Sequence, residues 1–559
     1  MPEILHVELV EQTAAALELR LWRDNPNEMW TRTLSLAEIA GLVDRAETDY
    51  YAPGSPRLVE LGRTLFRWLD GAERRLSAQI AAAAGRTDVL VLAVSTGWGL
   101  AHLPWEALHD DGGFLVHALD PPVLPVRWRR AGPPAHAPAN RPLQAVFMAA
   151  SPRDVQAVLN HGWEEHQILV ATQRWPMNLV VEESGSLEEL AVLLQAHGAG
   201  YFDVLHLTGH AAHGADGTPV FLLEDSEGRC ARVSARELAG GLPHRPPLVF
   251  LSGCHTGRRP SPGADLSLAE QLVGHGFRAV LGWAHRVDDL GATEAARHLY
   301  EHLAAGVSLP LAVVRTHARL RDAGREEWHL LRLFCAGDPL ASLVTPLRTP
   351  GRPQRGGRPA EAAFLDPLTR TLRVATRAEF AGRRRLVQDT LRSLRRPGGG
   401  RVGVLLHGAA GCGKSSVAAR LCDRLRTELQ RVVVLGRLDE PALVRAWAPE
   451  LPEPVRAALC DPSGGDLRFR IESALVALAG AGHPAPLFVL DGFEHNQPGG
   501  AGGDGSPDPQ SAPTLAALLD ALEHSRLGRV MVTGRFPLPE PYAGLLHSVF
   551  VPAARPRDG

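Results

Sequence analysis

The feature that most constrains the fold is a short apolar segment that ends at a cysteine. Residues 248–252 read LVFLS, and Gly253 and Cys254 follow them directly. A continuous apolar run closed by a small, turn-prone tip is typical of a strand buried on both faces of a parallel sheet. Such a strand delivers the next side chain to the edge where ligands bind in these sheets. The pattern therefore predicts that Cys254 stands at the tip of a buried strand.

A second segment of the same design lies upstream. Residues 204–208 read VLHLT and are followed by Gly209 and His210. His210 and Cys254 are 44 residues apart (254 − 210), which is close to the spacing in caspases and leaves room for a crossover helix. An imidazole beside a thiol stabilises the thiolate and then protonates the leaving amine. Each residue alone would more often be a packing residue, but the pair favours a thiol nucleophile with its acid–base partner.

These two segments resemble motifs of the CHAT peptidases, bacterial relatives of caspases and separase. LPWEALHD at 103–110 is similar to the LPWE-type motif of that family. Residues 143–153 look like its first core strand and loop, and residues 276–282 look like its next strand. The resemblance covers roughly residues 1–348 and implies a caspase-like α/β fold with a parallel sheet.

The resemblance also implies the roles of the site residues. His210 and Cys254 would form the catalytic dyad, and the backbone N–H groups of Cys254 and Ala211 would form the oxyanion hole. The family's usual His-Gly pair is here His210-Ala211, and alanine restricts the backbone where glycine would not. His213 and His255 are rival imidazoles, the first beyond the strand end and the second adjoining the cysteine.

Trp105 and Glu106, in the LPWE-type motif, admit two interpretations. They could take part in catalysis, or Trp105 could pack in the core while Glu106 anchors a loop. We favour packing and anchoring, because a large aromatic side chain within an apolar segment is usually buried for its contact area.

The periodicity of this region alternates between strand and helix. Such a rhythm predicts a mostly parallel sheet with helices on both faces. Before the core, strands or helices are expected at 4–22, 36–47, 56–84 and 88–93. In the core they are expected at 143–149, 154–171, 177–181, 186–197, 203–208, 234–242, 247–252, 266–276, 278–283, 291–306 and 309–323.

A second motif begins at Gly408. Residues 408–415 read GAAGCGKS and fit the pattern G-x-x-x-x-G-K-[ST] in full, after an apolar strand at 402–407. The glycines let backbone N–H groups approach phosphate oxygens, Lys414 would reach the β- and γ-phosphates, and Ser415 would bind Mg²⁺. The sequence therefore predicts a site for ATP and Mg²⁺.

Further nucleotide-binding residues are expected after two later strands. Asp491 follows a strand at 487–490 and is the expected second protein ligand of Mg²⁺. Glu494 is either the base that positions water or a solvated carboxylate, and Arg535 either senses the γ-phosphate or is an ordinary surface residue. The expected set is Gly408, Gly411, Gly413, Lys414, Ser415, Ser416, Asp491, Glu494 and Arg535.

This second region resembles the STAND class of signalling NTPases. The segments FAGRRRL, the P-loop, LFVLDGFE and VMVTGR occur in that order within residues 378–553. The resemblance implies an α/β nucleotide switch that is followed by a helical lid, a winged helix and sensor repeats. None of these is recognisable before residue 559, so we expect that the chain is a fragment or that another chain supplies them.

The length of 559 residues requires more than one domain. Residues 349–363 are rich in Pro, Gly and Arg and lack periodicity, as expected of a linker. The expected organisation is a CHAT domain at 1–348, with an N-terminal part at 1–135 and a catalytic core at 143–348, a linker at 349–377 and a P-loop NTPase at 378–559.

Composition restricts the partners and the compartment. A net charge of −3 argues against a general nucleic-acid-binding surface. The six cysteines include no C-x-x-C pair, so neither a disulfide framework nor a zinc site is indicated. The N-terminus lacks a basic signal-peptide region and no apolar run reaches ~18 residues, so we expect no membrane span and a cytoplasmic location.

Together these features predict a caspase-like cysteine endopeptidase gated by an ATP-binding NTPase. The family resemblance implies a role in bacterial defence or programmed cell death. One alternative is a nucleotide-switched scaffold whose CHAT domain is not proteolytic; another treats the chain mainly as an ATPase, against which Gly492 weighs, because many NTPases have a second acid there. The expected partners are a protein substrate, ATP and a trigger-sensing partner or C-terminal sensor. Activation is expected to occur by oligomerisation, because a flexible linker transmits little force.

Overall fold

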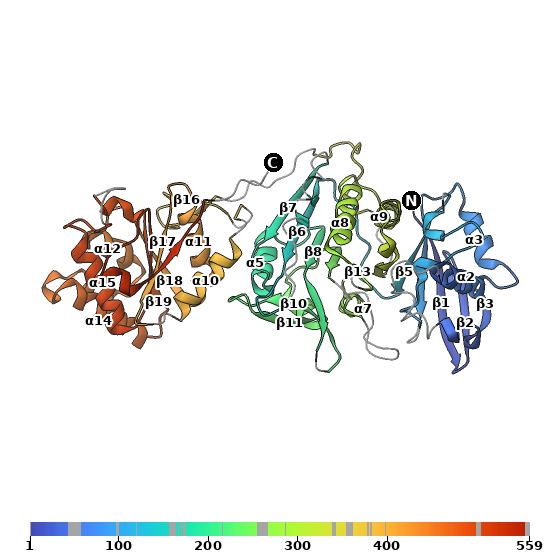
Figure 1. The fold of residues 1–559 in the computed structure, drawn as a ribbon, viewed down its shortest axis with the longest axis horizontal. Helices are drawn as coiled ribbons and strands as arrows, with labels where there is room; N and C mark the ends of the chain where they lie inside the picture. Colours follow the sequence, from blue (N-terminus) through green and yellow to red (C-terminus); the bar gives the residue numbers. More distant parts are fainter. Residues whose placement is uncertain are drawn as a thin grey trace. The chain divides into compact units, whose positions relative to one another are not determined.

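The chain divides into two units, Met1–Arg358 and Pro359–Gly559, in this computed structural model (Figure 1). The described residues are 2–42, 57–96, 100–118, 120–155, 164–165, 167–168, 170, 175–214, 216–253, 267–285, 287–337, 342–353, 362–376, 379–380, 383–396, 399–498 and 505–553. Within these ranges, no helix is both long enough and apolar enough to cross a bilayer.

The first unit is built on a sheet of eleven strands among the described residues. In spatial order they are β3 (Trp30–Ser35), β2 (Ala16–Trp22), β1 (Glu3–Thr13), β4 (Leu90–Thr96), β5 (Val123–Arg129), β14 (Leu331–Ala336), β13 (Ala279–Trp283), β12 (Leu248–Ser252), β8 (Val204–Thr208), β6 (Leu143–Ala149) and β7 (Met177–Glu182). Strands β7, β6, β8, β12 and β13 are parallel to one another, and so are β1, β4, β5 and β14. The predicted α/β class with a mostly parallel sheet is confirmed.

Strand β14 joins the two parts of this unit that the sequence analysis separated. It pairs antiparallel with β13 of the core and parallel with β5 of the N-terminal part. Every residue of β14 is buried, and one apolar cluster runs from Leu5 to Val344 across both parts. Residues 1–135 and 143–348 therefore share one sheet and one core.

Helices cover both faces of the core strands, as the alternation of strand and helix predicts. On one face lie α5 (Leu187–His197), α6 (Ala235–Gly241) and α7 (Leu268–Gly274). On the other lie α8 (Asp289–Ala304) and α9 (Leu309–Asp322). Because side chains alternate along a strand, Phe250 of β12 packs toward α8 while Leu251 packs toward α7. The N-terminal strands are accompanied by α2 (Arg57–Asp70) and α3 (Arg75–Ala83).

A small antiparallel sheet follows β8 and was not predicted. It consists of β11 (Cys230–Ser234), β10 (Pro219–Glu224) and β9 (His210–His213), in that order. All six residues of β10 are buried, and Phe221 and Leu223 belong to the apolar cluster beneath α5, α6 and α7. Most of the helix predicted at 154–171 and part of the one at 36–47 lie outside the described residues.

The second unit contains a five-stranded parallel sheet in the order β18 (Leu429–Leu435), β19 (Ala485–Asp491), β20 (Arg529–Gly534), β17 (Gly403–His407) and β21 (Leu546–Phe550). One face is covered by α12 (Glu440–Trp447), α14 (Leu467–Gly480) and α15 (Ala512–Ser525), and the other by α10 (Arg384–Arg395) and α11 (Lys414–Arg424). The other two α-helices of this unit among the described residues are α13 (Glu453–Cys460) and α16 (Tyr542–Leu545). This parallel arrangement is the α/β fold expected for the P-loop region.

Part of the predicted linker is folded onto this second unit. Strands β15 (Ala363–Phe364) and β16 (Arg373–Val374) pair as a hairpin. Val374 of β16 and Leu365, which follows β15, are buried in the apolar cluster around α11. Arg431 Nη1 donates to the carbonyl of Leu365 at 3.0 Å. The sequence analysis missed this because two-residue strands carry no readable periodicity.

Candidate functional site

The two predicted catalytic segments follow neighbouring strands in the interior of the large sheet. Strand β12 pairs in parallel with β8, and the last pair places Ser252 opposite Thr208. The register has an offset of 44 residues (252 − 208), which equals the separation of Cys254 and His210. His210 is half-buried at the start of β9, whereas Cys254 lies outside the described residues.

Hydrogen bonds at the strand ends fix the turn from β8 into β9. The Thr208 hydroxyl and the Gly209 N–H both donate to the carbonyl oxygen of Ser252 at 3.2 Å. A Cβ atom on Gly209 would lie 2.9 Å from the ring of Phe221, closer than such atoms approach. Glycine is therefore required before His210 because the small sheet packs directly against this turn.

A buried carboxylate lies beneath the strand ends. Glu164 Oε1 is 3.2 Å from Nε2 of His206 on β8, and it accepts a hydrogen bond of 3.0 Å from the hydroxyl of Ser252 on β12. The ring of His206 stacks on Phe250 at 4.6 Å and on Tyr300 of α8 at 5.8 Å between centroids. Glu164 thus ties together the two strands that lead to His210 and Cys254.

The surroundings keep this carboxylate ionised. Burial raises the pKa of Glu164, but His206 together with the hydroxyls of Thr208 and Ser252 outweighs burial and lowers the pKa below its usual range. Burial and then the charge of Glu164 raise the pKa of Tyr300 well above its usual range. The Tyr300 hydroxyl is buried with no hydrogen-bond partner in the described part of the chain. A negative charge is therefore held between His206 of β8 and Ser252 of β12.

We expect replacement of Glu164 by Gln to destabilise the first unit by about 1–3 kcal/mol, and by Ala by about 3–5 kcal/mol. Glutamine keeps an acceptor for Ser252 but loses the charge opposite His206, whereas alanine leaves both partners buried without an acceptor. Urea unfolding measures the change. Glu11, exposed on β1, gives the control Glu11→Gln, which should stay within about 0.5 kcal/mol of the wild type. Equal unfolding midpoints for the Glu164→Gln and Glu11→Gln proteins would contradict the prediction.

The other residues predicted for this site are placed as follows. Ala211 is the second residue of β9, which lies at the edge of the small sheet. His213 is exposed at the far end of β9, opposite Pro219, and His255 lies outside the described residues. Glu164 was missed, because an isolated glutamate in a polar segment carries no signal of burial.

The LPWE-type segment is held by buried ion pairs. Trp105 is fully buried, and Glu106 accepts from both Nη1 and Nη2 of Arg127, with the Nη2 bond at 3.2 Å. Arg332 Nε lies 3.9 Å from the same carboxylate. Burial alone would raise the pKa of Glu106, but the two guanidinium groups lower it below its usual range. This geometry agrees with the interpretation that Trp105 packs in the core and that Glu106 anchors its loop.

In the second unit, the P-loop connects β17 to α11. Gly411 and Gly413 have φ values of 73° and 87°, a conformation that glycine adopts without strain. The Lys414 ammonium donates to the carbonyl oxygens of Gly408 and Ala409 at 3.0 and 2.9 Å. Its charge therefore lies over the loop whose N–H groups would receive phosphates.

Ser415 and Asp491 meet at the end of the sheet. The Ser415 hydroxyl donates to Asp491 Oδ2 at 3.1 Å, and the Thr533 hydroxyl donates to Asp491 Oδ1 at 2.6 Å. Burial raises the pKa of Asp491, although both hydroxyl groups act to lower it. A hydroxyl and a carboxylate are oxygen donors of the kind that Mg²⁺ prefers. The residues present therefore fit ATP with Mg²⁺: Ser415 and Asp491 would hold the metal and Lys414 the phosphates.

Four further residues lie around this site. Arg535 Nε donates to Glu494 Oε1 at 3.2 Å, so these two predicted residues form an ion pair with each other. The Ser416 hydroxyl accepts from the N–H of Ala375, next to β16, at 3.1 Å. Arg383 was not among the predicted residues, although it lies in the FAGRRRL segment, which is the signal that could have identified it. Its Nη2 donates to the P-loop carbonyl of Cys412.

Comparison with solved structures finds many similar chains, among them chains of three proteins. The first is the Orc1 protein of Aeropyrum pernix in complex with DNA, at 20% identity over 31% of this chain and 46% of that one, with a TM-score of 0.22. The second is separase in the separase–securin complex of Saccharomyces cerevisiae, at 12% identity over 60% of this chain and 30% of that one, with a TM-score of 0.34. The third is PCH-2 of C. elegans, at 15% identity over 30% and 41%, with a TM-score of 0.18. The chain spans less than half the length of each, and no curated protein matches it.

Two family models match the sequence. The CHAT domain model matches residues 59–366, which is more than half of the chain, and the AAA ATPase domain model matches residues 379–532. The first match includes the paired strands β8 and β12, and the second includes the P-loop and Asp491. The chain therefore belongs to the CHAT family and carries an AAA ATPase domain after its CHAT domain.

Proposed function

We propose that the chain is a cysteine endopeptidase whose activity is gated by its ATP-binding domain. The observation that carries the proposal is the register of β8 and β12, which pairs Thr208 with Ser252. His210 and Cys254 each come two residues after that pair in the sequence. Both therefore follow the carboxyl ends of neighbouring parallel strands, which supports a meeting of the imidazole and the thiol.

In the proposed reaction, the Cys254 thiolate attacks the carbonyl carbon of the scissile peptide bond. The tetrahedral oxyanion is bound by the N–H groups of Cys254 and Ala211, and the edge position of β9 supports this role because edge strands leave N–H groups unpaired. His210 gives its proton to the leaving amine as the C–N bond breaks. Water, deprotonated by His210, then hydrolyses the thioester and restores the thiol.

The ATP-binding domain is proposed to act as a slow switch. Gly492 follows Asp491, where a second acid would speed hydrolysis, and Glu494 is engaged by Arg535 at 3.2 Å. Tight binding and slow hydrolysis of ATP suit a domain that switches between a nucleotide-bound and a nucleotide-free conformation. Gathering of nucleotide-bound copies would bring their CHAT domains together at high local concentration. A protein substrate, a trigger-sensing partner, a cytoplasmic location and a role in defence belong to the same proposal.

A comparison of cleavage products tests the proposal directly. Wild-type protein and the Cys254→Ala variant are each incubated with a bacterial lysate, ATP and Mg²⁺, and newly formed protein N-termini are labelled and identified. We expect a set of N-termini that only the wild type produces. Identical sets would overturn proteolysis and leave the nucleotide-switched scaffold as the function of the chain.

A further inference from the structure

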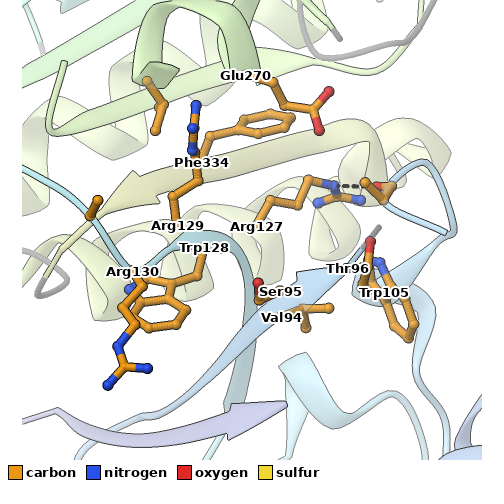
Figure 2. Close-up of a pocket in the computed structure, with 13 residues that line it drawn as sticks. Val94, Ser95, Thr96, Trp105, Arg127, Trp128, Arg129, Arg130, Glu270 and Phe334 are labelled. Carbon is orange, nitrogen blue, oxygen red and sulfur yellow. Dashed lines mark hydrogen bonds between the residues drawn. The ribbon is translucent and has the colours of Figure 1, made fainter. Parts of the chain in front are cut away.

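A pocket outside the proposed active site opens at the carboxyl ends of β4 and β5. It has a volume of about 440 Å³ and lies between these strands and α7. Figure 2 shows Ser95 and Thr96 on one side of it and Arg129 and Phe334 on the other. The carboxyl ends of parallel strands are where α/β sheets bind ligands, and this volume suits a small molecule.

The polar groups of the pocket are mainly hydrogen-bond donors. The indole N–H of Trp105 is buried and has no hydrogen-bond partner among the described residues. Trp105 and Thr96 both line the pocket, and Figure 2 draws them in the same part of the view. A buried donor without a partner costs free energy unless a ligand or water accepts from it. The hydroxyl group of Ser95 is a further donor at the end of β4.

Arg129 supplies a positive charge to this space. Its Nη1 lies over Gly274 of α7, where a Cβ atom would come within 2.6 Å of it. In Figure 2 its side chain points toward Phe334, whereas that of Arg130 points the opposite way. The nearby Arg127 is already engaged, since its Nε donates to the carbonyl of Ala101 at 2.9 Å and its Nη atoms donate to Glu106.

One carboxylate also lines the pocket. Glu270 accepts from the backbone N–H of Ser267 at 2.9 Å, as part of the capping box at the start of α7. The Glu270 carboxylate therefore lies at the N-terminus of its own helix, and the partial positive charge of that N-terminus offsets its negative charge. Apolar side chains that line the pocket include Phe334 of β14 and Val273 of α7, together with the aromatic ring of Trp128. The guanidinium of Arg127 lies over the Phe334 ring, 5.5 Å from its centroid.

We propose that this pocket binds a small anion that carries a flat apolar ring. The anionic head, a phosphate or a carboxylate, accepts hydrogen bonds from Arg129, Ser95 and the Trp105 N–H. The ring packs against Phe334 and Val273. Both head groups share this chemistry, and the experiment below separates them. The proposal stands without proteolysis, because none of these residues belongs to the proposed catalytic site.

Calorimetric titration of the full chain with phenyl phosphate and with benzoate tests the site. ADP and Mg²⁺ are present at saturation, so that the P-loop does not take up the probes. We expect saturable binding of at least one probe, and no binding of uncharged benzyl alcohol. Tighter binding of phenyl phosphate identifies a phosphate head, and tighter binding of benzoate a carboxylate. No saturable binding of either probe would overturn the proposal.

Variants assign the binding to this pocket. Arg129→Gln removes the charge and should weaken binding about tenfold. Trp105→Phe replaces the indole by a smaller aromatic ring without the unpaired N–H and should weaken binding about fivefold. Arg236→Gln is the matched control, because Arg236 is exposed on α6 and does not line the pocket. It should change the dissociation constant by less than about twofold. Binding that is unchanged in the Arg129→Gln protein would show that the probes bind elsewhere and would overturn the proposal.

Discussion

Replacing either Cys254 or His210 by Ala is expected to reduce peptide cleavage by about 10³-fold or more. The two groups act as one unit, since the thiolate attacks only while the imidazole stabilises it and later protonates the leaving amine. The double variant should therefore be no slower than either single variant. Cleavage of a peptide taken from the lysate experiment, followed by mass spectrometry, measures all three rates.

Two control variants separate this effect from general damage. Cys230 lies on β11, where burial, together with the nearby Asp154, raises the pKa of its thiol. Cys230→Ala should therefore keep full activity, because this thiol forms little thiolate at neutral pH. His213→Ala tests the rival imidazole at the far end of β9 and should also keep most of the activity. If His213→Ala inactivates the protein and His210→Ala does not, the assigned acid–base residue is wrong.

Replacing Lys414 by Ala is expected to weaken ATP binding by about 100-fold or more. The ammonium lies within 3.0 Å of two P-loop carbonyls, so its charge is already in place for the phosphates. A second positive charge near that loop belongs to Arg383, which donates to the Cys412 carbonyl. Calorimetric titration with ATP and Mg²⁺ gives the dissociation constant.

Arg426 provides the control for this second prediction. It follows α11, at the opposite end of that helix from the P-loop, and its Nη1 donates to the carbonyl of Asp423. Arg426→Ala removes a positive charge from the same region and should change the dissociation constant by less than about twofold. An unchanged affinity in the Lys414→Ala protein would mean that the loop does not bind the nucleotide phosphates.

The order of strands and helices in the core was predictable from the sequence. Apolar runs such as 248–252 and 204–208 are buried on both faces, and their continuous hydrophobicity marks them as parallel strands. The pairing of β5 with β14 was not predictable. Phe334 lies opposite Arg127 across 207 residues of sequence (334 − 127), and such a contact leaves no local pattern.

The functional residues divide in the same way. Lys414, Ser415 and Asp491 were found because a fixed motif and a strand end identify them, and the structure brings Ser415 and Asp491 together. Glu164 was not found, because its burial depends on His206 and Ser252, which lie far from it in the sequence. A sequence motif predicts local backbone geometry. A buried polar network depends on tertiary packing, which a motif does not contain.

The position of β14 has a consequence for synthesis of the chain. This strand lies between β5 and β13, so the sheet cannot close until the ribosome has released residues 331–336. At about 5–20 residues per second, the 207 residues from Arg127 to Phe334 take roughly 10–40 s to translate. During that interval β5 has an open edge, and β13 has one from the time residues 279–283 are made. A growing chain would therefore be expected to rely on chaperones, and the His210 and Cys254 segments would gain their complete support only when nearly the whole CHAT domain has been made.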